Sequence, residues 1–165
     1  MEKYVMEALF KMGEGQFAIE RFKKRFAAMV NHPDCSTLWE FWTYEASVNH
    51  AWSGGPLSVL YKNMAGIVPS KPGFEEFLVF PELLDKNSLN CSFSTVKGDI
   101  SLSMNIENGT TTMKIEVPKE SHATIRIPLA SDDVQFIPNA AIKELRKDDL
   151  YRYYQIESGN WTIVY

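Results

Sequence analysis

The sequence predicts an α+β protein in which a group of helices is followed by an antiparallel β-sandwich. From residue 2 to about residue 66, apolar residues recur at intervals of three and four. After Pro72 the apolar period changes to two. Turn-forming residues separate the alternating runs, roughly 8–12 residues apart, as in sandwich folds. We therefore place one domain at residues 1–72 and a second at residues 73–165.

Three helices are expected in the first domain. The first covers residues 2–12 and ends at Gly13, and the second covers about 16–29. Their short connection predicts an αα-hairpin. The third begins near Ser53 or Gly55 and closes at Gly66. Its inward-pointing residues are expected to be Leu57, Leu60, Tyr61 and Met64.

Strands are expected where apolar and polar residues alternate, within 89–95, 100–106, 113–117, 123–127 and 161–165. Hairpin turns are expected at 97–99, at Asn108-Gly109 and at 158–160, with Asn-Gly the strongest signal. The stretch 130–149 is polar and uneven, and one helical turn is expected around 140–145. Glu75 and Glu76 are expected to flank the first strand.

Composition narrows the possible functions. The chain has 165 residues, enough for one domain or for a small domain plus a fragment of another. The formal charge of −4 shows no excess of basic residues that could bind a phosphate backbone, so no nucleic-acid partner is expected. No apolar run could span a bilayer, so no membrane partner is expected either. Cys35 and Cys91 lie far apart, which argues against a disulfide framework or a metal site.

The N-terminal segment is charged and amphipathic, unlike a signal peptide. We expect a cytoplasmic location for the chain as given. A secreted or periplasmic parent stays open, because a signal could lie on a missing part.

The three predicted helices each have a wide apolar face, and about 65 residues cannot bury all three faces well. Either they pack against the sandwich or they belong to a larger helical array. We favour the second interpretation, a truncated chain. It predicts uncovered apolar surface around Phe17, Phe22 and Phe26, and self-association or pairing with a missing segment.

The segment between the second and third helices contains the side chains that could take part in catalysis or ligand binding. Glu40 lies between Trp39 and Trp42, and His50 and Trp52 follow ten and twelve residues later. An inverting glycosidase needs two carboxyl groups about 6.5–9.5 Å apart, with a water between them. Taken alone, the pattern is more typical of a core corner with an ion-paired glutamate than of a catalytic site.

A family resemblance changes that balance. Residues 37–42, 49–56 and 65–74 resemble the end of the catalytic barrel of the α-L-rhamnosidases, glycoside hydrolase family 78. Segments 97–100, 115–118, 123–128 and 158–162 resemble the β-sandwich that follows that barrel. The resemblance implies the last helices of an (α/α)6 six-hairpin barrel, followed by the sandwich, with no cofactor.

The resemblance makes Glu40 the general base that activates water and His50 a ligand of sugar hydroxyls. Trp39, Trp42 and Trp52 would form or support the wall of the site. The alternatives are a structural His50 that bridges the third helix and a Trp52 that packs in the core. Glu45 matches no catalytic position and is expected to be a solvated loop residue.

The family's general acid has no counterpart in the sequence. General acid–base assistance contributes roughly 10²–10⁴-fold per group, so we predict no meaningful hydrolysis by this chain alone. Rhamnose-containing glycosides should bind it weakly or not at all. Two alternatives remain: a non-catalytic carbohydrate-binding or interaction module, and a helical-barrel glycosidase for another sugar.

Overall fold

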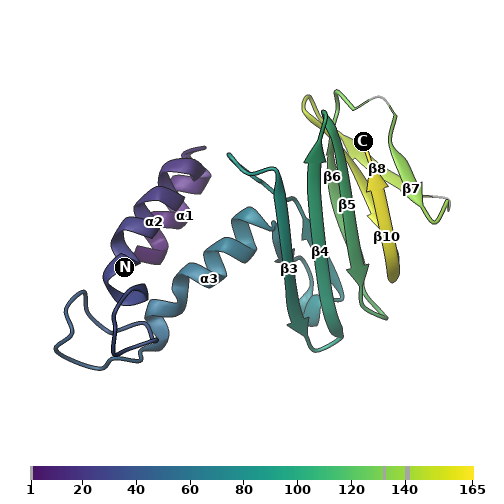
Figure 1. Cartoon of the computed structure of the whole chain (residues 1–165). Coiled ribbons are helices and arrows are strands. Elements are labelled where there is room, and N and C mark those ends of the chain that lie inside the picture. Colours follow the sequence, from purple (N-terminus) through teal and green to yellow (C-terminus); the bar gives the residue numbers. More distant parts are fainter. Residues whose placement is uncertain (1, 132, 140–141) are drawn as a thin grey trace. The chain divides into compact units, whose positions relative to one another are not determined.

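A computed structural model describes residues 2–131, 133–139 and 142–165, which form a helical unit and a β unit (Figure 1). The helical unit ends at Met64 and the β unit covers Ala65–Tyr165. The sequence places this boundary eight residues later, after residue 72. The difference arises because strand β1, Ile67–Pro69, pairs with β2, Glu76–Val79, and so belongs to a sheet.

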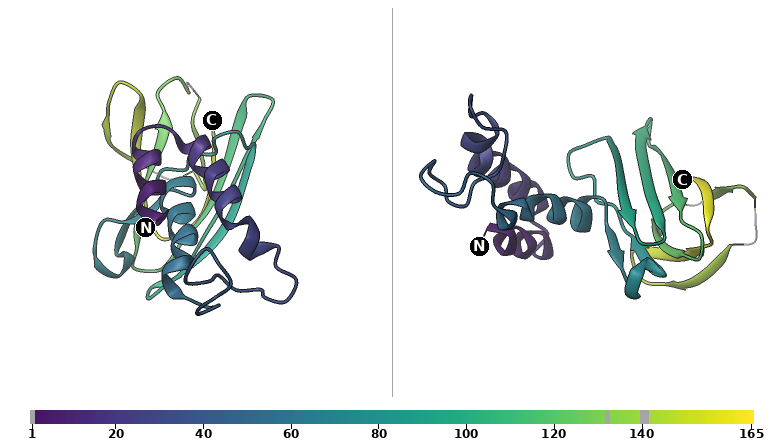
Figure 2. Two further views of the ribbon diagram at one scale, coloured as in Figure 1. Left: turned by 90° about the vertical axis from the view of Figure 1, so that its left-hand side faces the viewer. Right: turned by 90° about the horizontal axis from the view of Figure 1, so that it is seen from below.

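The helical unit contains the three expected helical stretches. Helix α1 is Glu2–Lys11 and α2 is Gly15–Val30. The third stretch begins as the 3₁₀ turn Ala51–Gly54, continues as α3, Gly55–Val59, and ends as the π turn Leu60–Met64. Helix α1 contacts both α2 and α3, and the three lie side by side in Figure 2. The positive φ of Gly13, 80°, confirms its predicted place after the first helix.

One prediction for the third stretch is wrong: Leu57 does not point inward, since 61% of its surface is exposed. Ser53, Pro56 and Val59 are the buried residues there. The stretch changes from 3₁₀ to α to π geometry, and each change rotates the following side chains relative to a uniform helix. A period of 3.6 therefore assigns the wrong face.

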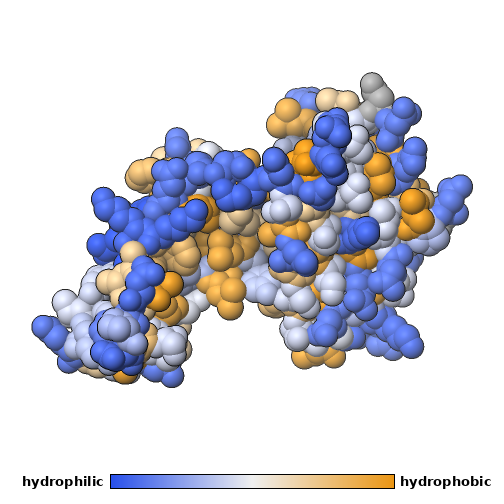
Figure 3. Space-filling view, in the orientation of Figure 1, coloured by the Kyte–Doolittle hydropathy of each residue, from blue (hydrophilic) through white to orange (hydrophobic). Residues whose placement is uncertain are grey.

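The core of the helical unit is small. Its buried apolar side chains are Met6, Phe10, Ala18, Ile19, Phe26, Met29, Trp39 and Val59. Other large apolar residues reach the surface: Tyr4, Val5, Met12, Phe17, Val30 and Leu57. Figure 3 shows hydrophobic atoms, in orange, on the surface of this unit. The predicted uncovered surface is therefore present at Phe17, which is 54% exposed, but not at Phe26, which is 4% exposed. No helix in the described ranges is long and apolar enough to cross a membrane.

The described part of the β unit contains two five-stranded sheets packed as a sandwich, with β3, β4 and β5 in front of β6 in Figure 1. The first sheet has the order β1-β2-β6-β9-β8, where β6 is His122–Pro128, β9 is Tyr151–Ile156 and β8 is Lys143–Lys147. The second has the order β3-β4-β5-β10-β7. Its strands are Ser88–Thr95, Gly98–Glu107, Thr110–Val117, Gly159–Val164 and Gln135–Ile137. A 3₁₀ turn, Pro72–Phe74, precedes β2.

The strand pairing corrects the purely antiparallel prediction. Strands β2 and β6 pair in parallel, with Phe77 opposite Ala123. The three strands between them in sequence, β3 to β5, lie in the other sheet, so the chain returns to the first sheet by a crossover rather than a hairpin. The sandwich is therefore mixed.

The turns differ in how they match the sequence. Asn108 and Gly109 form the predicted two-residue hairpin with φ of 50° and 81°, between the paired residues Glu107 and Thr110. The hairpin predicted at 158–160 is wrong, because β9 and β10 lie in different sheets and the turn is a corner between them. The helical turn predicted around 140–145 is also wrong for residues 143–145, which are in β8; Ala140 and Ala141 lie outside the described residues.

Candidate functional site

The loop between α2 and the third helical stretch folds back on itself and so positions Glu40. The Thr37 hydroxyl donates to the Val48 carbonyl, and the His50 amide donates to the Leu38 carbonyl over 2.9 Å. The Glu40 amide donates to the Ser47 carbonyl over 2.8 Å. These bonds hold two stretches of the loop side by side. Residues 41–46, at its tip, are exposed.

Two consecutive residues at the start of the third helical stretch bind this loop from the other side. The Trp52 indole Nε1 donates to the Glu40 carbonyl over 3.0 Å. The Ser53 hydroxyl donates to the preceding carbonyl, that of Trp39. Since both partners are backbone atoms, the bonds fix the path of the chain at Glu40 while leaving its side chain free of them.

Glu40 lines a cavity of about 290 Å³ within the helical unit. Its walls come from the start of α1, the second half of α2, the loop and the start of the third stretch. The lining residues include Glu2, Lys3, Arg25, Glu40, Trp42 and Trp52. The cavity therefore combines indole faces with both signs of charge.

The structure brings some of the predicted site residues together and separates others. Glu40, Trp42 and Trp52 line the cavity. Trp39 is 4% exposed and packs in a cluster with Phe26 and Met29, behind the loop. It therefore supports the loop from the core.

The described residues that line the cavity do not include His50. Its ring lies against that of Trp52, with centroids 4.6 Å apart, and its Nδ1 is buried without a hydrogen-bond partner. Trp52 thus connects the two predicted polar residues: it bonds the backbone of Glu40 and contacts the ring of His50.

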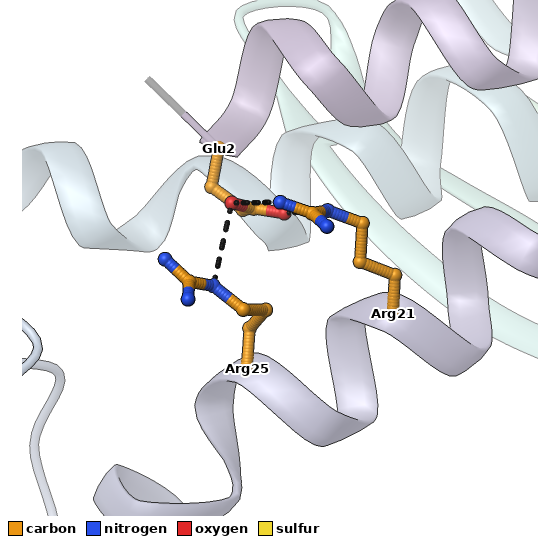
Figure 4. A network of polar contacts seen from close by, with 3 residues as sticks. All are labelled: Glu2, Arg21 and Arg25. Atoms are coloured by element: carbon orange, nitrogen blue, oxygen red, sulfur yellow. Dashed lines mark hydrogen bonds and ion pairs between the residues drawn. The ribbon is translucent and has the colours of Figure 1, made fainter.

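A second carboxylate, Glu2, lines the same cavity, which sequence reasoning missed. Figure 4 shows it between two arginines of α2. Arg21 donates to both oxygens, over 2.6 and 3.2 Å, and Arg25 Nε lies 3.6 Å from one of them. The Glu2 side chain is only 10% exposed. This is the arrangement of a structural ion pair between helices, not of a proton donor.

Arg25 also holds Trp42. The centre of its guanidinium group lies 4.1 Å from the Trp42 ring centroid, within cation–π range. Phe26 meets the same ring edge-on, with centroids 5.1 Å apart. Trp42 is 42% exposed, so one part of it is fixed by α2 while the remainder is open to solvent.

The rest of the loop offers little further chemistry. The hydroxyl and the backbone amide of Thr37 lower the pKa of the Cys35 thiol. Glu45 is exposed, as predicted, and accepts a hydrogen bond from the Thr43 hydroxyl over 3.2 Å. Among the described residues, no three His, Cys, Asp or Glu side chains form a group that could hold a metal ion.

Known families and structures resemble this chain. The family model of the bacterial α-L-rhamnosidase C-terminal domain matches residues 66–139. No curated protein sequence matches the chain significantly. Among solved structures, the Streptomyces avermitilis α-L-rhamnosidase complexed with L-rhamnose is 21% identical with a TM-score of 0.78, over 97% of this chain and 17% of that one.

Two further α-L-rhamnosidases share the fold. The one from Dictyoglumus thermophilum is 21% identical, with a TM-score of 0.77 over 99% of this chain and 20% of that chain. The native enzyme from Aspergillus terreus is 19% identical, with a TM-score of 0.66 over 96% of this chain and 18% of that chain. This chain thus spans 17–20% of the length of these solved relatives. Residues 66–139 thus match the family of bacterial α-L-rhamnosidase C-terminal domains, and the chain as a whole shares the fold of part of the α-L-rhamnosidases.

Proposed function

We propose that this chain acts as the C-terminal part of an inverting α-L-rhamnosidase-type glycoside hydrolase and contributes its general base, Glu40. The observation that carries the proposal is the place of Glu40. It lines a cavity with Trp42 and Trp52, and two hydrogen bonds hold its backbone there. It does so in a chain that aligns over 97% of its length with an α-L-rhamnosidase.

The chemistry requires two proton transfers. A carboxylate takes a proton from water as the water oxygen attacks the anomeric carbon, and an acid protonates the departing glycosidic oxygen. Glu40 would make the first transfer. The exposed faces of Trp42 and Trp52 would contact the C–H surfaces of the sugar ring, with Trp39 supporting the loop behind them.

His50 would bind a sugar hydroxyl. A buried ring nitrogen without a partner is uncommon in folded proteins, because its desolvation is not compensated. His50 Nδ1 is in this state, and its ring contacts Trp52 at the cavity wall. A small rotation of the imidazole would offer the nitrogen to a ligand beside Trp52.

The second proton transfer needs a group from elsewhere. Glu2, the other carboxylate at the cavity, is committed to Arg21 and Arg25. We therefore assign the general acid to a further helical segment, and α1 to α3 to the last helices of an (α/α)6 barrel. Exposed Val30 and Leu57 line one apolar groove on which such a segment would pack.

An aryl α-L-rhamnoside assay tests the catalytic part of the proposal. The chain alone should give only the background rate, and Glu40→Gln should leave that rate unchanged. A general acid is worth roughly 10²–10⁴-fold, and the barrel segment adds substrate binding. Robust turnover that disappears in Glu40→Gln would show that the chain holds both groups, contrary to the proposal.

An NMR titration with L-rhamnose tests the site. Weak binding should move the Trp42 and Trp52 indole signals and the His50 ring signals, while Trp161, inside the sandwich, serves as the internal control. Shifts confined to Trp161 and neighbouring strands would favour a carbohydrate-binding module instead. An absence of shifts at the three cavity-side residues, at high sugar concentration, would count against the site.

A further inference from the structure

The β unit has a cavity of about 620 Å³ at the side of the sandwich where both sheets end. Strands β7 and β8 are the last strands of their sheets, and Figure 1 shows both on the side away from β3. The cavity is lined by residues of β7 and of β9, the neighbour of β8. Its volume lies in the range of small-molecule sites, about 300–1,000 Å³. None of the described residues that line it is acidic.

Strand alternation places one lining residue, Arg152, on the inner face of its sheet. Arg152 lies opposite Ile127 of β6, and Tyr154, two residues later, lies opposite Ile125. Both isoleucines are fully buried. Residues paired across two strands share a face of the sheet, so Arg152 faces the interior of the sandwich, where it is half-buried. A guanidinium in such a place loses hydration, which is costly unless a partner replaces the water.

The described residues supply no such partner. Arg152 forms no ion pair, hydrogen bond or ring contact with any of them. Lys147 of β8 lies directly opposite Arg152 and is also without an ion pair among the described residues. Like charges opposite each other on neighbouring strands destabilise a sheet. Glu144, opposite Tyr154, forms an ion pair with neither cation. An anion between Arg152 and Lys147 would offset the lost hydration and the repulsion together.

The other walls of the cavity are mostly apolar. Phe136 of β7 lies opposite Ile163, which is fully buried, and so it also faces inward. Its ring meets that of Tyr154 edge-on, with centroids 5.2 Å apart. Further apolar residues complete the lining: Val134, Ile137 and Ile142. The amides of Gln135 and Asn139 are the remaining polar groups. The cavity thus combines one cation with aromatic and aliphatic surface.

We propose that this cavity binds a small carboxylate with an apolar or aromatic body, whose two oxygens accept hydrogen bonds from Arg152. The guanidinium presents a planar fork of N–H groups that matches a carboxylate. Lys147 adds attraction from the neighbouring strand. The cost of removing an ion from water rises steeply with its charge, so apolar walls favour a singly charged carboxylate over a phosphate dianion. The proposal goes beyond the proposed function and does not depend on Glu40.

An NMR titration of the whole chain with phenylacetate tests the inference. Binding should shift the Arg152 Nε signal and the Tyr154 ring signals, and the Trp52 indole signal of the helical unit should not move. Phenylacetamide, which has nearly the same shape without the charge, should bind at least about tenfold more weakly. Acetate, which lacks the ring, and inorganic phosphate should also be weaker ligands. Equal affinity for phenylacetate and phenylacetamide, or tighter binding of acetate or phosphate, would overturn the inference.

Variants on the two strands identify the cations that matter. Arg152→Gln should weaken phenylacetate binding about tenfold, and Arg152→Lys should lose part of the affinity because it keeps the charge without the fork. Lys147→Gln should weaken binding about 2- to 5-fold. Lys143→Gln is the matched control: this lysine is on the same strand but lies opposite Gln155, on the other face of the sheet, and should change nothing. Equal affinities of Arg152→Gln and Lys143→Gln would overturn the inference.

Thermal unfolding separates a ligand site from a structural arginine. Without ligand, Arg152→Gln should keep or raise the unfolding midpoint, because it removes the repulsion from Lys147. Saturating phenylacetate should raise the midpoint of the unchanged protein and have a smaller effect on Arg152→Gln. A lower midpoint of Arg152→Gln without ligand would show that Arg152 stabilises the chain through a partner of its own, contrary to the inference.

Discussion

The Trp52 indole Nε1 donates a 3.0 Å hydrogen bond to the backbone carbonyl of Glu40, twelve residues earlier in the chain. The same indole contacts the His50 ring, with centroids 4.6 Å apart. One side chain thus connects the backbone of the proposed base with the ring of the proposed sugar ligand. The position of Trp52, at the first turn of the third helical stretch, ties both residues to a helix.

Trp52→Phe keeps an aromatic ring beside His50 and removes the bond to Glu40. We expect the loop to open more often, with local stability lowered by about 0.5–1.5 kcal/mol, the usual net contribution of one hydrogen bond. Hydrogen exchange at the Glu40 and His50 amides, which bond within the loop, measures this opening. Trp42→Phe is the control, and it should leave both amides unchanged. Equal effects of the two variants would contradict a specific role of the Trp52 bond.

Gly66→Ala should severely destabilise the β unit. Gly66 has a φ of 66°, and an added Cβ would lie 2.1 Å from the Phe80 carbonyl oxygen. Gly13→Ala is the control, because Gly13 has a φ of 80° with open space around it. An alanine there has the cost of the positive φ without a steric clash. We expect a loss of about 1–2 kcal/mol at Gly13 and about 3 kcal/mol or more at Gly66. Chemical denaturation followed separately in each unit checks the difference, and equal losses would contradict the close contact.

Glu2→Gln should weaken the packing of α1 on α2. The variant removes the ion pairs with Arg21 and Arg25, and the Glu2 side chain is only 10% exposed. We expect the free energy of unfolding of the helical unit to fall by about 1–2 kcal/mol. Glu7→Gln, on the same helix, removes the 3.4 Å pair with the more exposed Lys62 and should cost about 0–0.5 kcal/mol. A larger loss for Glu7→Gln than for Glu2→Gln would refute this ranking.

Tyr165 should make the β unit sensitive to alkaline pH. Burial raises its pKa to about 12, because the phenolate is poorly solvated there. In the unfolded chain a tyrosine ionises near pH 10, so the stability from the neutral phenol is complete below about pH 10 and is lost as the pH rises to about 12. Denaturation between pH 9 and 12 should show a shallower decline in Tyr165→Phe than in the unchanged protein.

The exposed Tyr4 provides the control for that measurement, and Tyr4→Phe should not alter the slope. Some slope should remain in Tyr165→Phe, because a hydrogen bond to Asp148 also raises the pKa of Tyr153. A slope in Tyr165→Phe equal to that of the unchanged protein would contradict the burial of the neutral phenol.

Local patterns predicted much of the fold. Helices α1 and α2 and the strands β3 to β6 follow from periods that each segment carries in its own residues. The corner at 158–160 could not be told from a hairpin, because the choice of sheet depends on which distant strand receives β10. Strand β8 was missed since all five of its residues are exposed and show no apolar alternation.

The candidate site was predictable where its residues are neighbours in sequence. Glu40, Trp42 and Trp52 lie within one short segment, and the structure places all three at one cavity. Glu2 and Lys3 come from α1, and only the packing of α1 on α2 and α3 brings them there. Arg21 and Arg25 are four residues apart, a spacing that places both on one face of α2. This spacing could have indicated that the two arginines share a carboxylate partner.

Strand β10, the last in this sequence, lies inside its sheet between β5 and β7. During synthesis on a ribosome, β3, β4 and β5 can therefore form a meander early, while β7 has to wait for a neighbour that emerges about twenty residues later. Until β10 has emerged, the open side of β5 offers unpaired backbone groups to other nascent chains. The second sheet should consequently stay incomplete until β10 has been synthesised, and chaperone binding should concentrate on that interval.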